Sequence, residues 1–151
     1  MKGMKVFLGL GSNMGDRGEN IRKAIEAIDA LPCTSVDAVS GIMETEAAGK
    51  WDATAENGPG RFLNCCVRID TSVPPQRLLA MVEEIERKLG REDKGIKLND
   101  RGERIYSDRP IDIDILLYGK RRINTAALQI PHPRMQERDF VMISLKETMN
   151  K

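Results

Sequence analysis

Residues 111–118, IDIDILLY, are the stretch that decides the fold of this chain. Apolar and acidic residues alternate through its first half, and a period of two is typical of a β-strand that buries one face. The side chains expected on the core face are Ile111, Ile113, Ile115 and Leu117. Asp112 and Asp114 are therefore expected on the opposite face, about 7 Å apart along the strand.

Three further strands and two helices precede this stretch. The predicted strands are residues 5–11, 34–46 and 62–71. Asp16, followed by Glu19, has the pattern of a helix N-cap, and apolar residues then recur at helical spacing as far as Leu31. A second helix is expected to start at Pro74-Pro75 and to stop at Gly90.

The resulting element order is β-α-β-β-α-β, and residues 135–149 are expected to add a C-terminal helix. This order predicts an α+β fold, in which a ferredoxin-like antiparallel sheet carries two helices on one face. The other face is then left for a third element or a ligand. Residues 50–61 are rich in Gly, Asn and Ala, and residues 91–109 are charged and poor in apolar side chains. We expect loops there, the second of them either disordered or an active-site lid.

The length and composition indicate a single domain over residues 1–151. Lys and Arg number 24 against 23 Asp and Glu, and this net charge of +1 argues against a protein that binds nucleic acids or membrane surfaces. The sequence contains no run of roughly 20 apolar residues that would span a membrane. Cys33, Cys65 and Cys66 lack the spacing of a disulfide framework or a zinc site. We therefore expect a cytoplasmic monomer with reduced thiols.

Cationic side chains lie near the two aspartates in the sequence. Arg109 stands three residues before Asp112. Other arginines at loop or helix-start positions are Arg91, Arg104 and Arg138. Planar guanidinium groups suit bidentate phosphate contacts, and Mg²⁺ is typically held by one or two carboxylates together with substrate phosphates. The combination predicts a metal–polyphosphate site, whereas the aspartates alone also fit a solvated strand face.

Three other features are candidates for ligand contact. His132 is the only histidine and stands between Pro131 and Pro133, which would fix it either as a phosphate donor or in a structural turn. Asn64 is expected on the same side of the sheet as the aspartates, where its amide would read the edge of a heterocycle or bond a neighbouring loop. The glycines of residues 9–15, GLGSNMG, allow the chain to approach a ligand or a neighbouring strand closely.

Taken together, these residues resemble the 6-hydroxymethyl-7,8-dihydropterin pyrophosphokinase family of the folate pathway. The matching segments are LGLGSNMGD (8–16), ETEAAG (44–49), FLN (62–64), IERKLGR (85–91), RPIDIDILLYG (109–119) and IPHPRMQERDF (130–140). They run in family order over nearly the whole chain. The most specific part is R-x-x-D-x-D-I-L followed by P-H-x-x-M-x-x-R-x-F.

The resemblance implies a ferredoxin-like enzyme that moves the β,γ-pyrophosphoryl group of ATP onto the pterin hydroxymethyl group and releases AMP. The positions matched to two bridging Mg²⁺ ions are Asp112 and Asp114. Those matched to phosphate contact and catalysis are Arg91, Arg109, His132 and Arg138. Those matched to the pterin pocket are Thr45, Phe62, Asn64 and Phe140, with the ring stacked between the two phenylalanines. Those matched to the ATP site are Leu79, Glu86 and Ile115.

Other classes of protein fit part of the pattern. A ferredoxin-like module that binds a ligand without catalysis explains the element order, and Mg²⁺-dependent ATP binding would separate it from an enzyme. A nucleotide-sugar transferase also uses an Asp-x-Asp pair, although 151 residues are few for that class. An RNA-binding module is less favoured because stacking aromatic residues and a basic face are missing from the pattern.

Overall fold

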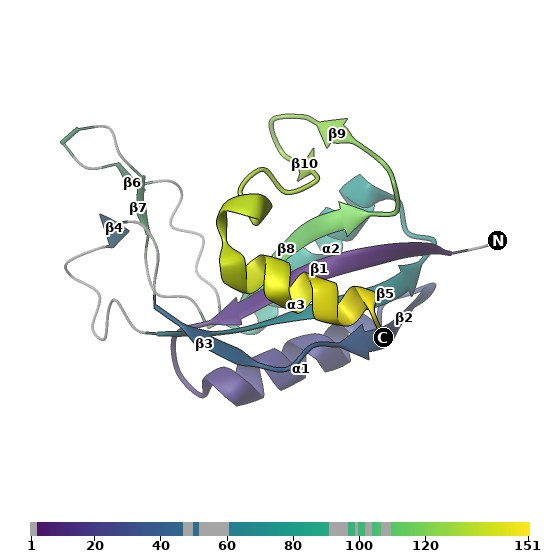
Figure 1. The fold of residues 1–151 in the computed structure, drawn as a ribbon, viewed down its shortest axis with the longest axis horizontal. Helices are drawn as coiled ribbons and strands as arrows, with labels where there is room; N and C mark the ends of the chain where they lie inside the picture. The colour runs from purple at the N-terminus through teal and green to yellow at the C-terminus, as the bar shows by residue number, and fades with distance from the viewer. Residues whose placement is uncertain are drawn as a thin grey trace.

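A computed structural model describes residues 3–46, 50–51, 61–90, 97–98, 100–101, 104–106 and 110–151. Its main sheet consists of β1 (Met4–Ser12), β2 (Thr34–Val39), β3 (Met43–Thr45), β5 (Phe62–Thr71) and β8 (Asp112–Tyr118). The α-helices of the described residues are α1 (Arg17–Asp29), α2 (Pro75–Lys88) and α3 (Asp139–Met149). The strand order is β2-β5-β1-β8, β3 also pairs with β5, and these pairings are all antiparallel. The expected α+β architecture with an antiparallel sheet and a C-terminal helix is confirmed (Figure 1).

The two helices between the strands begin and end close to the predicted positions. The Asp16 carboxylate accepts a hydrogen bond from the backbone N–H of Glu19 at 3.1 Å, which caps α1. α2 begins at Pro75, and Gly90 follows it with a φ of +103°, a left-handed conformation that glycine adopts without strain. Each helix turns an apolar stripe toward the sheet. The buried apolar residues of these stripes are Ile21, Ala24 and Ile28 in α1, and Leu78, Val82 and Ile85 in α2.

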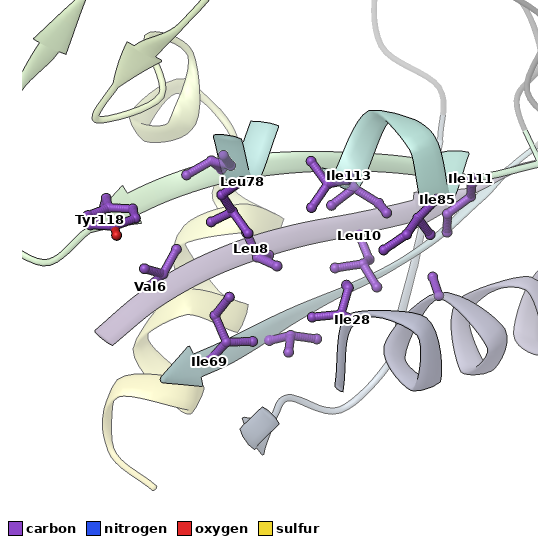
Figure 2. Close-up of a cluster of buried hydrophobic side chains, with 14 of the residues drawn as sticks. Val6, Leu8, Leu10, Ile28, Ile69, Leu78, Ile85, Ile111, Ile113 and Tyr118 are labelled. Carbon is purple, nitrogen blue, oxygen red and sulfur yellow. The ribbon is translucent and has the colours of Figure 1, made fainter. Parts of the chain in front are cut away.

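The main core lies between the sheet and the helices α1 and α2 (Figure 2). Alternate residues of the strands supply it, so that Val6 and Leu8 of β1 and Ile113 of β8 are at most 4% exposed. The residues that β5 buries in it are Cys65, Val67 and Ile69, opposite the face expected for Asn64. Full burial of a side chain such as Leu8 contributes about 1.5–3 kcal/mol to stability.

A second, smaller apolar cluster lies on the opposite face of the sheet, under α3. Its buried members are Phe7, Cys66, Leu116, Met135 and Leu145. Figure 1 shows α3 crossing the face of the sheet that α1 and α2 leave free. Arg68 of β5 holds the end of this helix, because its Nη1 donates to the carbonyl of Thr148 at 3.1 Å. Elsewhere on this face, Asn64 and Asp112 remain partly exposed.

A β-bulge in β8 overturns one detail of the predicted alternation. Leu8 of β1 pairs with Ile115 and Phe7 pairs with Leu117, so that Leu116 has no partner in the ladder. Leu117 consequently packs against the second cluster rather than on the core face expected for it. The isoleucines before the bulge are buried in the main core as predicted.

The strand predicted at residues 34–46 consists of two strands, β2 and β3, which pair with β5 before and after Ser40. The Ser40 N–H donates to the carbonyl of Cys66 at 2.9 Å, and its hydroxyl oxygen accepts the Cys66 N–H at 2.8 Å. A register shift also produces a bulge at Asp37. These irregularities explain why the apolar residues of this segment do not alternate cleanly.

The segments expected as loops contain short strands. β4 (Lys50–Trp51) pairs with β7 (Arg104–Tyr106), which also pairs with β6 (Lys97–Leu98), in a separate small sheet. The expectation of structureless loops at residues 50–61 and 91–109 is therefore wrong at these positions, because backbone pairing between distant segments leaves no mark on composition. Most of the remainder of both segments lies outside the described residues.

The chain after β8 is more interrupted than expected. Two short strands, β9 (Ile123–Asn124) and β10 (Gln129–Ile130), pair with each other, and the sequence pattern did not indicate β10. The helix expected from residue 135 starts as a 3-10 turn, η1 (Met135–Glu137), and α3 follows after Arg138. The break places Arg138 in extended backbone between two helical segments.

All three cysteines are free, with Cys33 exposed and Cys65 and Cys66 buried. Burial raises the pKa of the Cys65 thiol to about 12. Within the described ranges, no helix has the length and apolar character needed to cross a membrane.

Candidate functional site

A row of facing residues crosses the central strands near the end of β1 and the start of β8. Gly11 of β1 pairs with Asn64 of β5 on one side and with Asp112 of β8 on the other. Facing residues of antiparallel strands project from the same side of a sheet, so Asn64 and Asp112 flank Gly11 on one face. A Cβ on Gly11 would lie 3.1 Å from Asn64 Oδ1. The glycine thus adds no side chain of its own between the amide and the carboxylate.

The carboxylates of Asp112 and Asp114 emerge from this same face. The intervening Ile113 is 4% exposed and points into the main core, as the alternation of a strand requires. Both aspartates are partly exposed, so water or a ligand can reach them. The pair predicted from the sequence therefore stands on the face that also carries Asn64.

A backbone hydrogen bond brings His132 to the aspartates. Its N–H donates to the carbonyl of Leu116, the bulged residue of β8, at 3.0 Å. The ring Nδ1 accepts the N–H of Arg134 at 3.3 Å, so the proton of the neutral ring resides on Nε2. Nε2 lies 3.9 Å from Oδ1 of Asp114, too far for a hydrogen bond. The ring thus presents a donor beside the carboxylate pair.

Electrostatics connect His132 to Arg138 and Asp112. Burial lowers the pKa of His132 below its ordinary value, the positive charge of Arg138 lowers it further, and the Asp112 carboxylate opposes the change. The imidazole is therefore neutral at pH 7. The predicted residues that the structure brings into one neighbourhood are Asp112, Asp114, His132 and Arg138.

Arg138 carries an unsatisfied donor. Its Nε is buried without a hydrogen-bond partner among the described residues. Such a group costs about 1–3 kcal/mol, and in folded proteins it calls for an explanation such as a water or a ligand. A phosphate oxygen would satisfy it, because guanidinium groups bind phosphate through charge-assisted hydrogen bonds. This arrangement suits an anion close to the carboxylates.

Asn64, Thr45 and Phe62 form a second corner of the same face. Thr45 of β3 pairs with Phe62 of β5, and Asn64 Nδ2 donates to Thr45 Oγ1 at 2.7 Å. A Cβ on Gly11 would lie 3.3 Å from Phe62 Cδ1, which places the phenyl ring beside the Gly11 row. An amide, a hydroxyl and an aromatic ring together can bind a flat polar heterocycle. Phe140, the fourth residue predicted for this pocket, lies in α3 and is partly buried.

Three charged residues that the sequence reasoning missed hold this corner in place. Arg17 of α1 donates from Nη1 to the Arg61 carbonyl at 2.8 Å and pairs with Glu44 at 3.0 Å. Arg61 pairs with Glu44 at 3.1 Å, and the guanidinium groups of Arg61 and then Arg17 hold the pKa of Glu44 below its ordinary value. Glu44 precedes Thr45 and Arg61 precedes Phe62, so these bonds fix both strands at the corner. Glu44 stands in the ETEAAG segment, whereas its partners Arg17 and Arg61 come from separate segments, so no local signal reveals the contact.

The residues predicted for the nucleotide lie on the α2 side of β8. Ile115 is 3% exposed in the main core, and Leu79 packs against that core from α2. Glu86 of α2 is 4% exposed, and its Oε2 accepts the N–H of Ile113 at 2.8 Å. The structure does not bring these residues to the aspartate-bearing face, and their contact with a nucleotide stays a prediction. The predicted phosphate contacts outside the described residues are Arg91 and Arg109.

The donor set fits a hard divalent cation that is held jointly with a substrate. In the part of the chain that the structure describes, no three His, Cys, Asp or Glu side chains converge as a metal cage. Asp112 and Asp114 offer carboxylate oxygens, which Mg²⁺ prefers, and Mg²⁺ usually completes its coordination with waters and phosphate oxygens. Because Arg138 also lacks an acceptor for Nε, the residues present fit a magnesium-bound phosphate.

The sequence is similar to proteins that share one described activity. Residues 7–150 match the family model for 7,8-dihydro-6-hydroxymethylpterin-pyrophosphokinase (HPPK). A protein of Aquifex aeolicus named 2-amino-4-hydroxy-6-hydroxymethyldihydropteridine pyrophosphokinase is 39% identical over 142 residues, which are 94% of this chain and 78% of that protein. The Bacillus subtilis protein of the same name is 38% identical, with 94% of this chain and 76% of that protein covered.

Solved structures agree at the level of the fold. An HPPK-DHPS protein crystallised in complex with substrates matches with a TM-score of 0.61 at 13% sequence identity, over 95% of this chain and 40% of that chain. A Plasmodium falciparum HPPK-DHPS protein gives a TM-score of 0.58 at 13% identity, over 97% of this chain and 40% of that chain. This chain thus corresponds to about two fifths of the length of those proteins, and the likeness concerns the fold alone.

Proposed function

Because this chain belongs to the 7,8-dihydro-6-hydroxymethylpterin-pyrophosphokinase family, we propose that it transfers the β,γ-pyrophosphoryl group of ATP to 6-hydroxymethyl-7,8-dihydropterin in folate biosynthesis. The observation that carries the proposal is the placement of two kinds of site on one sheet face. A carboxylate pair with imidazole and guanidinium donors lies at one end, and an amide, a hydroxyl and a phenyl ring lie at the other. The first suits a magnesium-bound polyphosphate and the second a pterin, and Gly11 separates them.

In the proposed reaction, the hydroxymethyl oxygen attacks the β-phosphorus of ATP. The bond from that phosphorus to the oxygen that bridges the α- and β-phosphates breaks, and AMP leaves with the electron pair. The hydroxyl proton passes to water. Transfer of this kind depends on positioning and charge neutralisation rather than on covalent help from the protein. Two Mg²⁺ ions held by Asp112 and Asp114 together with the ATP phosphates would supply the charge neutralisation.

The cationic and imidazole donors are assigned to the phosphates. Arg138 would gain an acceptor for its buried Nε when a phosphate oxygen binds. The Nε2–H of neutral His132 would donate to an oxygen of the same polyphosphate, and its fixed tautomer supports this role. Arg91 and Arg109 are proposed as further phosphate contacts, on the family resemblance of their positions.

The corner at the other end is assigned to the pterin. We propose that the ring lies between Phe62 and Phe140, where stacking provides apolar contact. Asn64 Nδ2 bonds Thr45 in the free protein, and it would turn this donor and its carbonyl oxygen to the pterin edge. Gly11 would add no side chain of its own between the pterin and the phosphates.

We also assign the main sheet to the ferredoxin-like type. β1, α1 and β2 form a β-α-β unit whose strands are separated by β5, and β5, α2 and β8 form a second unit whose strands are separated by β1. Two interleaved split units of this kind support the assignment. The interleaving makes β1 and β5 central strands, which places Gly11 and Asn64 in the most firmly paired part of the sheet.

The test is AMP release by the purified protein supplied with ATP and Mg²⁺. We expect AMP to form only when hydroxymethyldihydropterin is present, in equal amount with the pyrophosphorylated pterin. Chelation of Mg²⁺ should stop turnover. Production of ADP, or of AMP without any pterin, would contradict the proposal. Gel filtration in the same buffer tests the expected monomer.

A further inference from the structure

Glu86 is a buried carboxylate bonded to the backbone of the strand that carries the aspartates. It lies on α2 with 4% of its surface exposed, and its Oε2 accepts the N–H of Ile113 at 2.8 Å. A buried carboxylate is costly unless hydrogen bonds compensate it, and an N–H bond to a charged acceptor is stronger than one between neutral groups. The bond is informative because Ile113 stands between Asp112 and Asp114.

The place of β8 in the sheet explains what this bond does. β8 lies at one edge of the described main sheet, and it pairs with β1, where Leu10 faces Ile113. On its other side, α2 supplies Glu86 as the partner of the Ile113 N–H. A slip of one residue in a strand turns every side chain to the other face, and an outer strand is held by a neighbouring strand on one side alone. Such a slip would turn Asp112 and Asp114 toward the core.

We propose that Glu86 is a positioning residue for the aspartate pair, and that it acts through the Ile113 backbone rather than by touching ATP. The N–H of Ile113 belongs to the peptide group that joins Asp112 to Ile113. Fixing this group fixes the direction in which the Asp112 side chain leaves the strand, and the pleat then sets that of Asp114. The inference rests on the proposed function, because it assumes that the two carboxylates hold magnesium and phosphate. The proposed role of Glu86 requires an acceptor oxygen at the right distance from the Ile113 N–H rather than a negative charge.

Two substitutions separate the effect of the length of the Glu86 side chain from the effect of its charge. Glu86→Gln removes the charge and keeps an acceptor oxygen at the same reach, whereas Glu86→Asp keeps the charge and shortens the side chain by one methylene. Glu83→Gln is the matched control, because Glu83 is an exposed glutamate of the same helix. For each protein, amide hydrogen exchange at Ile113 is measured by NMR without ligands. The kcat, the KM of each substrate and the Mg²⁺ concentration that gives half the maximal rate are measured in the AMP assay.

We expect Glu86→Asp to be the damaging change. The Ile113 amide should exchange faster in this variant, and kcat should fall by about 10–100-fold, the range typical for residues that orient metal ligands. The Mg²⁺ requirement should rise, while the KM for the pterin stays unchanged. Glu86→Gln should keep the Ile113 amide protected and should lose less turnover than Glu86→Asp. Glu83→Gln should change none of these quantities.

The reverse order, with Glu86→Gln inactive and Glu86→Asp active, would overturn the proposal because charge would then be what matters. Faster exchange at Ile113 with unchanged kcat and Mg²⁺ requirement would also overturn it. A rise in the KM for ATP alone would indicate direct nucleotide contact and refute it as well. If Glu86→Asp does not fold, Glu86→Gln decides, since lost turnover with a protected Ile113 amide contradicts positioning. If the unaltered protein shows no pterin-dependent AMP release, the proposed function fails, and the exchange data still establish whether Glu86 holds β8.

Discussion

Gly11→Ala would place a methyl group between the two halves of the proposed site, and the structure gives the clash that follows. The new Cβ would lie 3.1 Å from Oδ1 of Asn64, 3.3 Å from Cδ1 of Phe62 and 3.8 Å from the Leu63 carbonyl oxygen. Ordinary van der Waals contacts of a Cβ are 3.4–4 Å, so Asn64 or Phe62 must move by a few tenths of an ångström. Gly11 is not among the glycines with positive φ, so the backbone itself accepts alanine.

We expect Gly11→Ala to weaken recognition of the pterin rather than of ATP. Displacing the Asn64 amide from the ring edge, or the Phe62 ring from its stack, forfeits an interaction of about 1–3 kcal/mol. This range corresponds to about 5- to 150-fold in kcat/KM for the pterin. The KM for ATP should stay the same, because the displaced side chains do not belong to the phosphate end of the site.

Steady-state AMP release, with each substrate varied in turn, measures the effect. Gly9→Ala is the matched control, because its Cβ would meet the Leu116 side chain at 3.5 Å, an ordinary distance. We expect Gly9→Ala to keep its pterin kinetics while Gly11→Ala loses them, and thermal unfolding checks that both variants fold. Equal losses in the two variants, or unchanged pterin kinetics in Gly11→Ala, would refute the assignment of this corner to the pterin.

Three further predictions concern the carboxylates, the histidine and the thiols. Asp112→Ala and Asp114→Ala should each lower kcat by about a thousandfold or more in the AMP assay, because each removes oxygen ligands from the proposed metal–phosphate site; near-normal turnover would exclude the metal role. His132, the single histidine, should titrate in proton NMR below its ordinary pKa because it is buried, and a raised pKa would mean that the neighbouring carboxylates dominate. Burial raises the pKa of Cys65 to about 12, so a thiol reagent at mildly alkaline pH should modify exposed Cys33 and spare Cys65. The folded protein favours the neutral Cys65 thiol, and the contribution of this preference to the free energy of unfolding should be complete below about pH 8. It should decline as the pH rises toward 12, and urea unfolding at several pH values measures the decline.

The regular parts of the sheet were predictable because their information is local. The alternation in β5 placed Asn64 on the face away from the core, and the structure confirms this placement, with Cys65 and Val67 buried in the core. Asp16 marked the start of α1 because a cap bonds an N–H only three residues away. Local hydrogen bonds and side-chain periods of this kind depend on residues that are neighbours in the sequence, so the sequence pattern predicts them.

The irregular parts depend on partners that are distant in the sequence. Ser40 interrupts the edge of the sheet because its hydroxyl accepts the N–H of Cys66, 26 residues away. The bulge at Leu116 is visible only in the pairing of β8 with β1. A period-two pattern assumes an unbroken ladder, and it therefore placed Leu117 on the wrong face.

The candidate site also has a part that the local sequence pattern predicted and a part that it did not. The aspartate pair and Asn64 were placed on one face from the alternation of their own strands, and β1 joins them through Gly11. Neither the Arg17 contact with the Arg61 carbonyl nor the Glu86 contact with the Ile113 N–H has a sequence signal. Each is a bond from a helix side chain to the backbone of a segment that is distant in the sequence, and a backbone partner of this kind leaves no trace in residue type.

The unpaired Leu116 makes the length of β8 matter as much as its composition. Deleting this residue would restore a regular ladder, yet it would remove the carbonyl that receives the His132 N–H. It would also pull back Tyr118, whose hydroxyl donates to the Val73 carbonyl across the core. Deletion of this one residue would therefore free both the segment that carries His132 and the Tyr118 side chain, while Asp112 and Asp114 kept their places. The fold should tolerate the exchange of one apolar residue for another in this strand far better than any change in the number of its residues.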